Sequence, residues 1–392
     1  MRPLLFALAL LLVATGARAQ KPPAPQAPNP VTPEEIERLR REIEREERSS
    51  LEFLLDGHTE TGDLNNKLDF LGLGTRLNLK HGAATTFHVT ARYTPYRTPD
   101  GVVEESGTSL ALGVKSRRSD RFEYEWELGA VRFSTDRWDA TGLVGVTVRS
   151  SDKLRYSVRA GRSLVEESML SAVGLHPVLG PFAGSRVGAV TDNRVSAAVT
   201  WQLPLRIDVV GEGAVGLRAG SQVGTNFFQR AGGGPAWNAV AKAPEEKLSL
   251  LRLGVWFEYF GFDEDRLGYG GASLLDAQGQ PVPLSELGSD GISPDPDPPH
   301  PGVGGYFSPQ RFTSTVGRVD VRGRAHEKLD YNVTLVLGTQ SYTGTDRRGA
   351  GGVAVSLTLR AGERFSLPLA YRWDDYGPFT QQSFQARLVL HF

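Results

Sequence analysis

The sequence has no cysteine among its 392 residues. This absence excludes a disulfide framework, a zinc–thiolate centre and a cysteine nucleophile. The net charge of −1 leaves no excess of basic residues, which argues against nucleic-acid binding. The mean hydropathy of −0.27 is too low for a polytopic helical membrane protein. The 45 glycines are many for a soluble α/β enzyme, so an all-β fold stays open.

The N-terminus has the pattern of a secretory signal peptide. Arg2 precedes a run of eleven apolar residues, 4–14, and Ala17 and Ala19 form a small-x-small cleavage site. The run is shorter than the roughly 20 apolar residues that a membrane-spanning helix needs. We therefore predict a signal peptide over residues 1–19.

A spacer and a charged helix follow the signal peptide. Residues 20–33 contain six prolines and predict a Pro-rich, semi-rigid linker. Thr32 and Glu35 form a capping box, so we predict a periplasmic helix over 34–50 that is rich in Glu and Arg. Two interpretations of this helix stay open: a solvated helix held by i,i+4 ion pairs, or a docking helix for a periplasmic partner.

From residue 51 onward, apolar and polar residues alternate. Phe122, Tyr124, Trp126 and Leu128, for example, are separated by three glutamates. In a strand this period of two gives one apolar and one polar face. The runs are longer than the usual soluble strand of about 5–6 residues and match the roughly 9–11 residues of a transmembrane strand. Because an open sheet edge is forbidden in lipid, residues 51–392 predict a closed transmembrane antiparallel β-barrel in the outer membrane of a Gram-negative-type bacterium.

We predict sixteen strands, the even number typical of bacterial barrels. The segment 226–242 is rich in glycine, and we include it because it restores the alternation between short and variable connections, with the very long segment 263–304 on the variable side. The predicted strands are 51–58, 67–80, 84–97, 107–118, 121–134, 139–150, 153–163, 186–203, 206–218, 226–242, 248–262, 305–323, 328–343, 349–361, 365–374 and 381–392.

The last predicted strand ends on an aromatic residue. Phe384, Leu388 and Phe392 belong to its alternating apolar set. A terminal aromatic that ends an alternating strand resembles the signal by which outer-membrane barrels are recognised by the barrel assembly machinery. We expect that machinery and outer-membrane lipid as partners of the chain.

The polar face of the predicted strands carries both signs of charge, so we expect a mixed-sign lumen without strong ion selectivity. A sixteen-stranded barrel leaves an aqueous channel unless a loop fills it. Trp256 shares a face with two charged residues, and two interpretations stay open: stacking on sugar rings or packing against a loop. The candidate lumen-lining residues are Arg76, Arg92, Glu123, Glu125, Glu127, Arg155, Arg159, Arg252, Trp256, Glu258, Arg318, Asp320 and Arg322.

Motifs for catalysis are weak in this sequence. The seven histidines show no metal-ligand spacing, and there is no H-E-x-x-H, phosphate-binding loop or G-x-S-x-G motif. We therefore predict a non-enzymatic protein with no catalytic residues, metal or cofactor.

Three segments resemble the C-terminal barrel of cellulose synthase operon protein C, a family of outer-membrane exopolysaccharide export porins. Residues 304–312 read G-G-Y-F-S-P-Q-R-F and match that family's G-G-Y-[FY]-S-P-Q-x-[FY] signature. Residues 162–174 resemble its motif of an acidic-Ser pair followed by Leu-Ser and Gly, and 61–66 lie where the family has its first hairpin. The motif loop comprises Gly305, Tyr306, Phe307, Ser308, Pro309 and Gln310.

The resemblance implies a channel that passes a linear polysaccharide, cellulose-like or another matrix or capsule polymer, from the periplasm to the surface. Full-length members carry tetratricopeptide repeats before the barrel, and no such repeat is present here. We therefore expect a separate periplasmic scaffold or export protein. The alternatives are a general or substrate-specific diffusion porin, and a surface-binding barrel with a closed lumen.

Overall fold

The computed structural model describes residues 48–62, 68–82, 84–97, 104–174, 186–221, 223–264, 306, 308–343, 346–362, 364–375 and 379–392. The predicted signal peptide and linker lie outside the described residues, as does the predicted helix up to residue 47. Among the described residues, no helix has the length and apolar character needed to cross a membrane.

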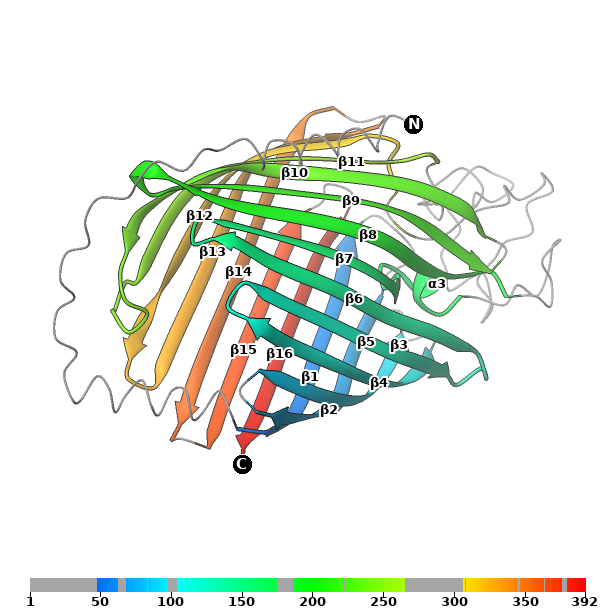
Figure 1. Cartoon of the computed structure of the whole chain (residues 1–392). Helices are drawn as coiled ribbons and strands as arrows, with labels where there is room; N and C mark the ends of the chain where they lie inside the picture. The colour runs from blue at the N-terminus through cyan, green and yellow to red at the C-terminus, as the bar shows by residue number, and fades with distance from the viewer. Residues whose placement is uncertain are drawn as a thin grey trace, which may run out of the picture. The chain divides into compact units, whose positions relative to one another are not determined.

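The described chain forms one closed antiparallel β-barrel in which each strand pairs with its neighbours in sequence (Figure 1). The prediction of sixteen strands is confirmed, including the glycine-rich tenth strand. The strands are β1 Ser50–Gly62, β2 Asp69–His81, β3 Thr85–Arg97, β4 Glu104–Ser119, β5 Phe122–Phe133, β6 Trp138–Ser151, β7 Leu154–Leu164, β8 Gly188–Leu203, β9 Ile207–Ser221, β10 Val223–Ala241, β11 Leu250–Phe262, β12 Phe312–His326, β13 Leu329–Tyr342, β14 Arg348–Ala361, β15 Phe365–Asp375 and β16 Phe379–His391.

The first and last strands close the ring. Their pairing runs from Ser50 opposite His391 to Gly62 opposite Phe379. The amide of Phe392 also donates to the carbonyl of Ser49, at 3.0 Å. Closure leaves no unpaired strand edge, which is the requirement for a sheet in lipid.

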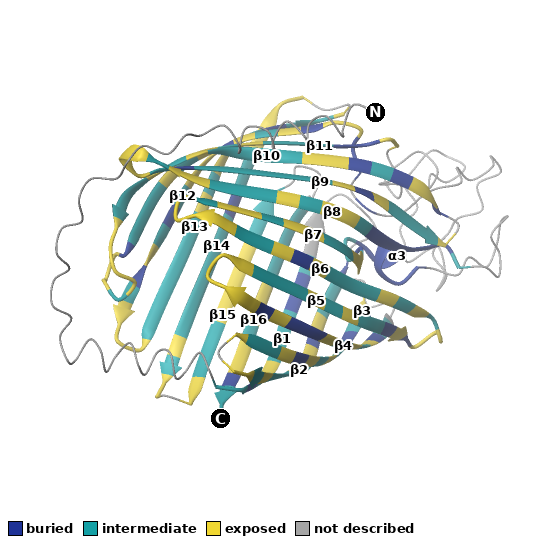
Figure 2. Ribbon diagram, viewed as in Figure 1, coloured by how far each residue is buried: buried dark blue, intermediate teal, exposed yellow. Residues whose placement is uncertain are grey.

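The two faces of the wall differ in polarity. Large apolar side chains on one face are exposed, among them Leu337 at 73% and Leu128 at 65%. On each strand they alternate with charged, hydroxyl or glycine residues of the other face, so exposed and less exposed positions follow one another along the strands (Figure 2). An apolar outer face and a polar inner face are typical of a barrel in a lipid bilayer.

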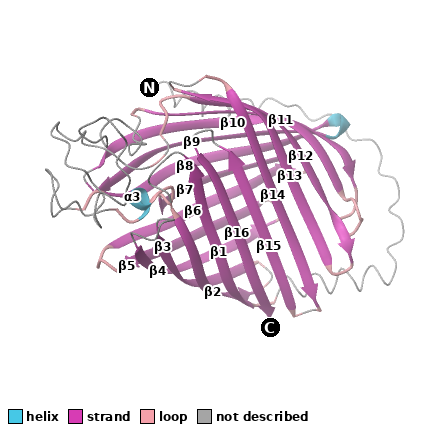
Figure 3. Cartoon of the chain, turned by 180° about the vertical axis from the view of Figure 1, so that it is seen from behind, coloured by secondary structure: helices cyan, strands magenta, loops and turns pink. Residues whose placement is uncertain are grey.

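The two ends of the barrel have connections of different length. We call the end with the short connections, 82–84, 120–121, 152–153, 204–206, 242–249, 327–328 and 362–364, the turn end. The opposite end, which includes 165–187 and 263–311, is the loop end. Figure 3 shows that strands make up almost all of the described chain; the 3₁₀ helix η1 (Pro204–Arg206) lies at the turn end, and the helix α3 (Met169–Ala172) lies at the loop end.

One strand boundary was predicted too early. The sequence predicts a strand from residue 305, but β12 begins at Phe312. Pro309 has no amide hydrogen to donate to a ladder, and its carbonyl instead accepts from the amide of Phe262, at 3.0 Å. Tyr306, Ser308 and Pro309 are fully buried. These residues therefore fold against the wall before the strand begins.

Candidate functional site

The register of the strands places the predicted lumen residues on the polar face. In β11 and β12, Arg252 lies opposite Asp320, Trp256 opposite Val316, and Glu258 opposite Ser314. Glu125 lies opposite Gly145 of β6, which in turn lies opposite Arg159 of β7. Whether a solute passes along these residues stays a prediction. The same face carries Arg76, Arg92, Glu123, Glu127, Arg155, Arg318 and Arg322.

Ion pairs between neighbouring strands, or across one intervening strand, neutralise much of this face. Arg159 Nε donates to Glu125 Oε1 at 2.7 Å. Arg230 of β10 lies between two carboxylates, with Nη2 2.8 Å from Glu258 and 3.4 Å from Glu212. Such pairs hold long side chains against the wall and leave the lumen polar with little local net charge.

Trp256 packs against the wall. Gly232 of β10 lies opposite Glu258, on the same face as the indole. A Cβ atom at Gly232 would lie 3.0 Å from Cζ2 of Trp256, so the indole covers this glycine closely. The ring therefore contacts the adjacent strand, and the two interpretations that the sequence left open, stacking on sugar rings or packing against a loop, stay predictions.

Residues 165–174 form a folded segment on the inner side of the loop end. Ser168 caps the short helix α3 by accepting from the amide of Ser171 at 3.0 Å, and Ser171 Oγ accepts from the amide of Ser168 at 2.9 Å. This reciprocal capping box fixes the helix start. We call residues 165–174 the crossing segment.

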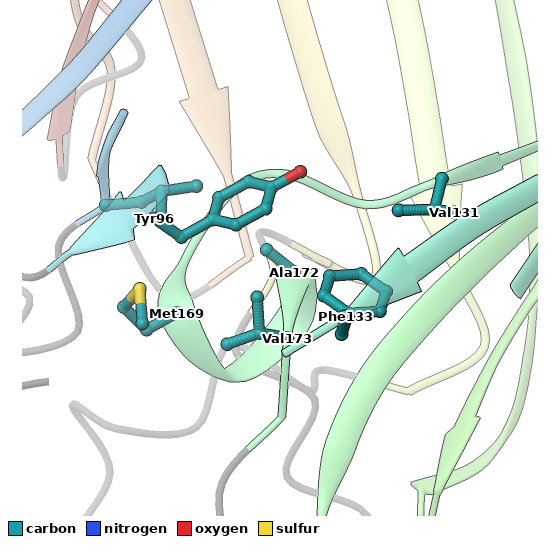
Figure 4. Close-up of a cluster of buried hydrophobic side chains, with 7 residues drawn as sticks. Tyr96, Val131, Phe133, Met169, Ala172 and Val173 are labelled. Carbon is teal, nitrogen blue, oxygen red and sulfur yellow. The ribbon is translucent and has the colours of Figure 1, made fainter. Parts of the chain in front are cut away.

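The apolar side of the crossing segment packs on the inner wall. Met169, Ala172 and Val173 form a buried cluster with Tyr96 of β3 and with Leu68, Val131 and Phe133, and Figure 4 shows the side chains gathered around the helix. Each buried side chain of this size contributes roughly 1.5–3 kcal/mol relative to an exposed one. Since the segment leaves the wall at β7 and returns at β8, this contact with β3 and β5 carries it across part of the lumen.

Polar tethers hold the crossing segment from two sides. Tyr96 Oη of β3 donates to Glu166 Oε1 at 2.6 Å. Arg218 Nη1 of β9 donates to Glu167 Oε1 at 2.8 Å. Five strands separate β3 from β9 in the ring. The two glutamates, adjacent in sequence, are therefore bound by well-separated parts of the barrel.

Two further arginines bind the end of the crossing segment. The Val173 carbonyl accepts from Arg137 Nη1 at 3.1 Å and from Arg186 Nη1 at 2.5 Å. Both arginines lie in connections at the loop end. Burial lowers the pKa of each guanidinium, and the carboxylates of Asp139 and Glu105 oppose this shift. These contacts satisfy a carbonyl at the helix end that would otherwise lack a partner.

Arg218 joins the crossing segment to the motif loop. Its Cζ lies 4.8 Å from the ring centroid of Tyr306 and 5.1 Å from that of Phe262. Tyr306 is fully buried, and Asn226 Nδ2 donates to its hydroxyl at 3.2 Å. The two motifs that the sequence singled out, more than 130 residues apart, therefore meet through one guanidinium.

The rest of the motif loop supports this contact. Ser308 Oγ donates to the carbonyl of Tyr306 at 3.2 Å. Gln310 Nε2 donates to the carbonyl of Asp263 at 3.3 Å. Gly305 and Phe307 lie outside the described residues. Of the site residues, sequence reasoning missed Arg218, Tyr96 and Asn226. The one sequence feature that could have indicated them is their position on the polar face of a strand, close to its loop end.

The chain has relatives of known family and fold. Residues 65–271, just over half of the chain, match the family described as cellulose synthase operon protein C C-terminus. The motif loop lies beyond this match. No curated protein matches the chain.

Among solved structures, a bacterial polysaccharide outer membrane secretin is similar with a TM-score of 0.59 at 13% identity, covering 88% of this chain and 99% of that chain. A BenF-like porin from Pseudomonas fluorescens Pf-5 gives a TM-score of 0.43 at 8% identity, covering 88% of this chain and 98% of that chain. At these identities the first likeness shows a shared barrel fold.

Proposed function

Since the chain belongs to the family of the cellulose synthase operon protein C C-terminus, we propose that it is an outer-membrane channel that exports an exopolysaccharide from the periplasm to the cell surface. The supporting observation is the crossing segment, which is tethered to β3 and β9 inside a polar barrel. A diffusion porin works with a permanently open mouth, whereas an export channel for a long polymer benefits from a mouth that is covered between export events.

The connections support one orientation in the membrane. In outer-membrane barrels the short turns face the periplasm and the longer loops face outward. We therefore propose that the turn end is periplasmic and the crossing segment lies at the outer mouth. Strand β1 starts at Ser50, at the turn end, so the part of the helix predicted over 34–50 that precedes this strand would lie on the periplasmic side.

The inner face of β14 and β16 is suited to contact with sugars. On β14 and β16 the inner face carries the hydroxyls of Ser356, Thr358 and Ser383 and the amide of Gln385. Hydroxyl and amide groups exchange hydrogen bonds with sugar hydroxyls without fixing a charge near them. A polysaccharide is therefore the proposed cargo, and a separate periplasmic export protein and the barrel assembly machinery are the proposed protein partners.

Deletion of the gene tests the proposal directly. Polymer would be quantified in surface and periplasmic fractions, with the wild-type chain supplied in trans as the control. We expect surface polymer to fall by at least tenfold and periplasmic polymer to accumulate. Unchanged surface polymer together with slower uptake of small solutes would instead identify a diffusion porin. Unchanged polymer and uptake, with no conductance of the purified barrel in planar bilayers, would identify a closed surface-binding barrel.

A further inference from the structure

The inner face near the turn end carries six basic side chains, which we call the basic ring. Its members face the lumen by register, and among the described residues none of them has a carboxylate oxygen within 4.0 Å. Three carboxylates at the same end are bound by other groups: Glu123 by Lys115 at 3.1 Å, Asp208 by Arg252 at 3.0 Å, and Asp330 by Arg324 at 2.8 Å. The basic ring comprises Arg76, Lys80, Arg149, Arg155, Arg322 and Arg387.

The members of the basic ring surround the lumen. They come from three sectors of the barrel: β16 with β2, β6 with β7, and β12. Three or four strands separate one sector from the next in the ring order. A molecule in the lumen at this level would therefore meet positive charge from all sides. A protein docked on one part of the rim would meet only part of the basic ring.

Two members of the basic ring lie directly opposite each other. Arg149 of β6 pairs with Arg155 of β7. The Arg149 amide donates to the carbonyl of Arg121 on the other side, at 2.8 Å, so Arg149 and Arg155 form a non-hydrogen-bonded pair, in which side chains approach most closely. Like charges in this position destabilise a sheet. No packing of the two side chains offsets this repulsion, since both are exposed.

Arg76 shows a second unmet interaction. Its Nε is buried and has no hydrogen-bond partner. Glu52 lies directly opposite Arg76. Its Oε1 accepts from Asn78 Nδ2 at 2.7 Å, and its Oε2 is itself buried without a hydrogen-bond partner. A buried donor without a partner is costly, and an acceptor brought by a ligand would satisfy it.

The middle and the loop end of the inner face are different. There, arginines hold carboxylates of neighbouring residues, as in the pairs Arg159–Glu125, Arg230–Glu258 and Arg318–Asp320. Arg194 in the middle and Arg348 at the loop end also lie on the inner face without a carboxylate of the described residues within 4.0 Å, but most of the basic side chains in this state lie at the turn end. In the proposed orientation this end is the periplasmic entrance.

We propose that the basic ring binds the carboxylates of an anionic, uronate-bearing polysaccharide as the polymer enters the barrel. This inference rests on the proposed export function and names the class of its cargo. A ring of cations raises the local concentration of a polyanion at the entrance, and arginine forms bidentate contacts with carboxylates. Past the ring, the ion-paired middle of the lumen has less free positive charge, so the polymer is not retained.

Binding of labelled oligosaccharides to the purified full chain in detergent tests this inference. Fluorescence polarisation would compare oligogalacturonate with cellohexaose, a neutral oligomer of similar length. We expect oligogalacturonate to bind more tightly, and more weakly as salt is raised. The double variant Arg149→Gln/Arg155→Gln should weaken its binding about tenfold, because two exposed charge contacts are lost. Arg149→Lys/Arg155→Lys should retain most of the binding.

The matched control removes two arginines that the fold already pairs. Arg318→Gln/Arg372→Gln, whose arginines hold Asp320 and Asp374, should change oligogalacturonate binding less than twofold. Equal binding of the two oligosaccharides, or equal loss in both double variants, would overturn the inference. Binding of labelled polyglutamate that oligogalacturonate does not displace would also overturn it, in favour of an acidic protein partner. If deletion still removes surface polymer, only the cargo class fails and the export function stands.

Discussion

The two ends of the inner face differ in whether their arginines are bound by other groups of the chain. At the loop end, aromatic side chains are buried, and arginines such as Arg137 and Arg218 bind groups of the chain itself. At the turn end, Arg149, Arg155 and Arg322 are exposed to the lumen and hold no carboxylate among the described residues. The same residue type therefore holds the crossing segment at one end and has no carboxylate partner among the described residues at the other.

The difference follows from what lies opposite each arginine. A carboxylate or carbonyl brought by the crossing segment satisfies the guanidinium at the loop end, and burial strengthens each such contact. At the turn end no described residue of a connection brings a carboxylate oxygen within 4.0 Å of the basic ring. Water, or a ligand, is then the remaining partner for the basic ring.

The largest expected effect comes from Gly188, which lacks a side chain where Leu170 of the crossing segment packs against it. Gly188 has a φ of +92°, and a Cβ there would lie 2.2 Å from the carbonyl oxygen of Leu170. Gly188→Ala should therefore displace the crossing segment at a cost of about 3 kcal/mol or more, from backbone strain and overlap together. Hydrogen exchange over residues 165–174 should rise strongly, and the conductance of the barrel in planar bilayers should increase.

Gly349→Ala is the matched control for this change. A Cβ at Gly349 meets no atom within 4 Å, and Gly349, unlike Gly188, does not lie in the left-handed region. Hydrogen exchange and conductance should stay at the wild-type level. Raised exchange over residues 165–174 without raised conductance in the Gly188→Ala variant would show that the crossing segment does not cover the mouth.

The second effect concerns the guanidinium that joins the two motifs. Arg218→Ala removes the ion pair with Glu167 and the stacking on Tyr306, and it leaves the buried carboxylate of Asp192 without this neighbour. A loss of about 2–3 kcal/mol in the stability of the crossing segment is expected, measured by hydrogen exchange as above.

Arg218→Lys separates charge from stacking. It keeps the positive charge but loses the planar group, so protection of the crossing segment should fall between the values of the wild type and Arg218→Ala. Protection at the wild-type level in Arg218→Ala would show that the apolar cluster alone holds the segment.

The sequence predicted the wall better than the mouth, for a physical reason. Strand pairing repeats every two residues, so the alternation in Phe122–Leu128 suffices to identify a strand and its faces. Even β10, with glycines at 232–234, followed from the alternation of connection lengths. The crossing segment depends instead on single contacts between distant residues. Arg218 carries the same local pattern as any inward arginine, and the burial of Tyr306 depends on where β9 and β11 bring their side chains.

The smallest expected effect is an increase in stability at the turn end. Arg149→Glu replaces the like-charge pair with Arg155 by an attractive one, which should stabilise the barrel by about 0.5–1 kcal/mol. The midpoint of urea unfolding of the purified barrel in detergent measures this change, and Arg149→Gln, which only removes the repulsion, should give a smaller gain. Oligogalacturonate binding should fall at the same time, because one cation is lost and the other is neutralised. A barrel that becomes more stable and binds oligogalacturonate as before would show that the repulsion between Arg149 and Arg155 serves no ligand. An increase in stability together with a loss of binding is expected where a fold retains unfavourable charge for function.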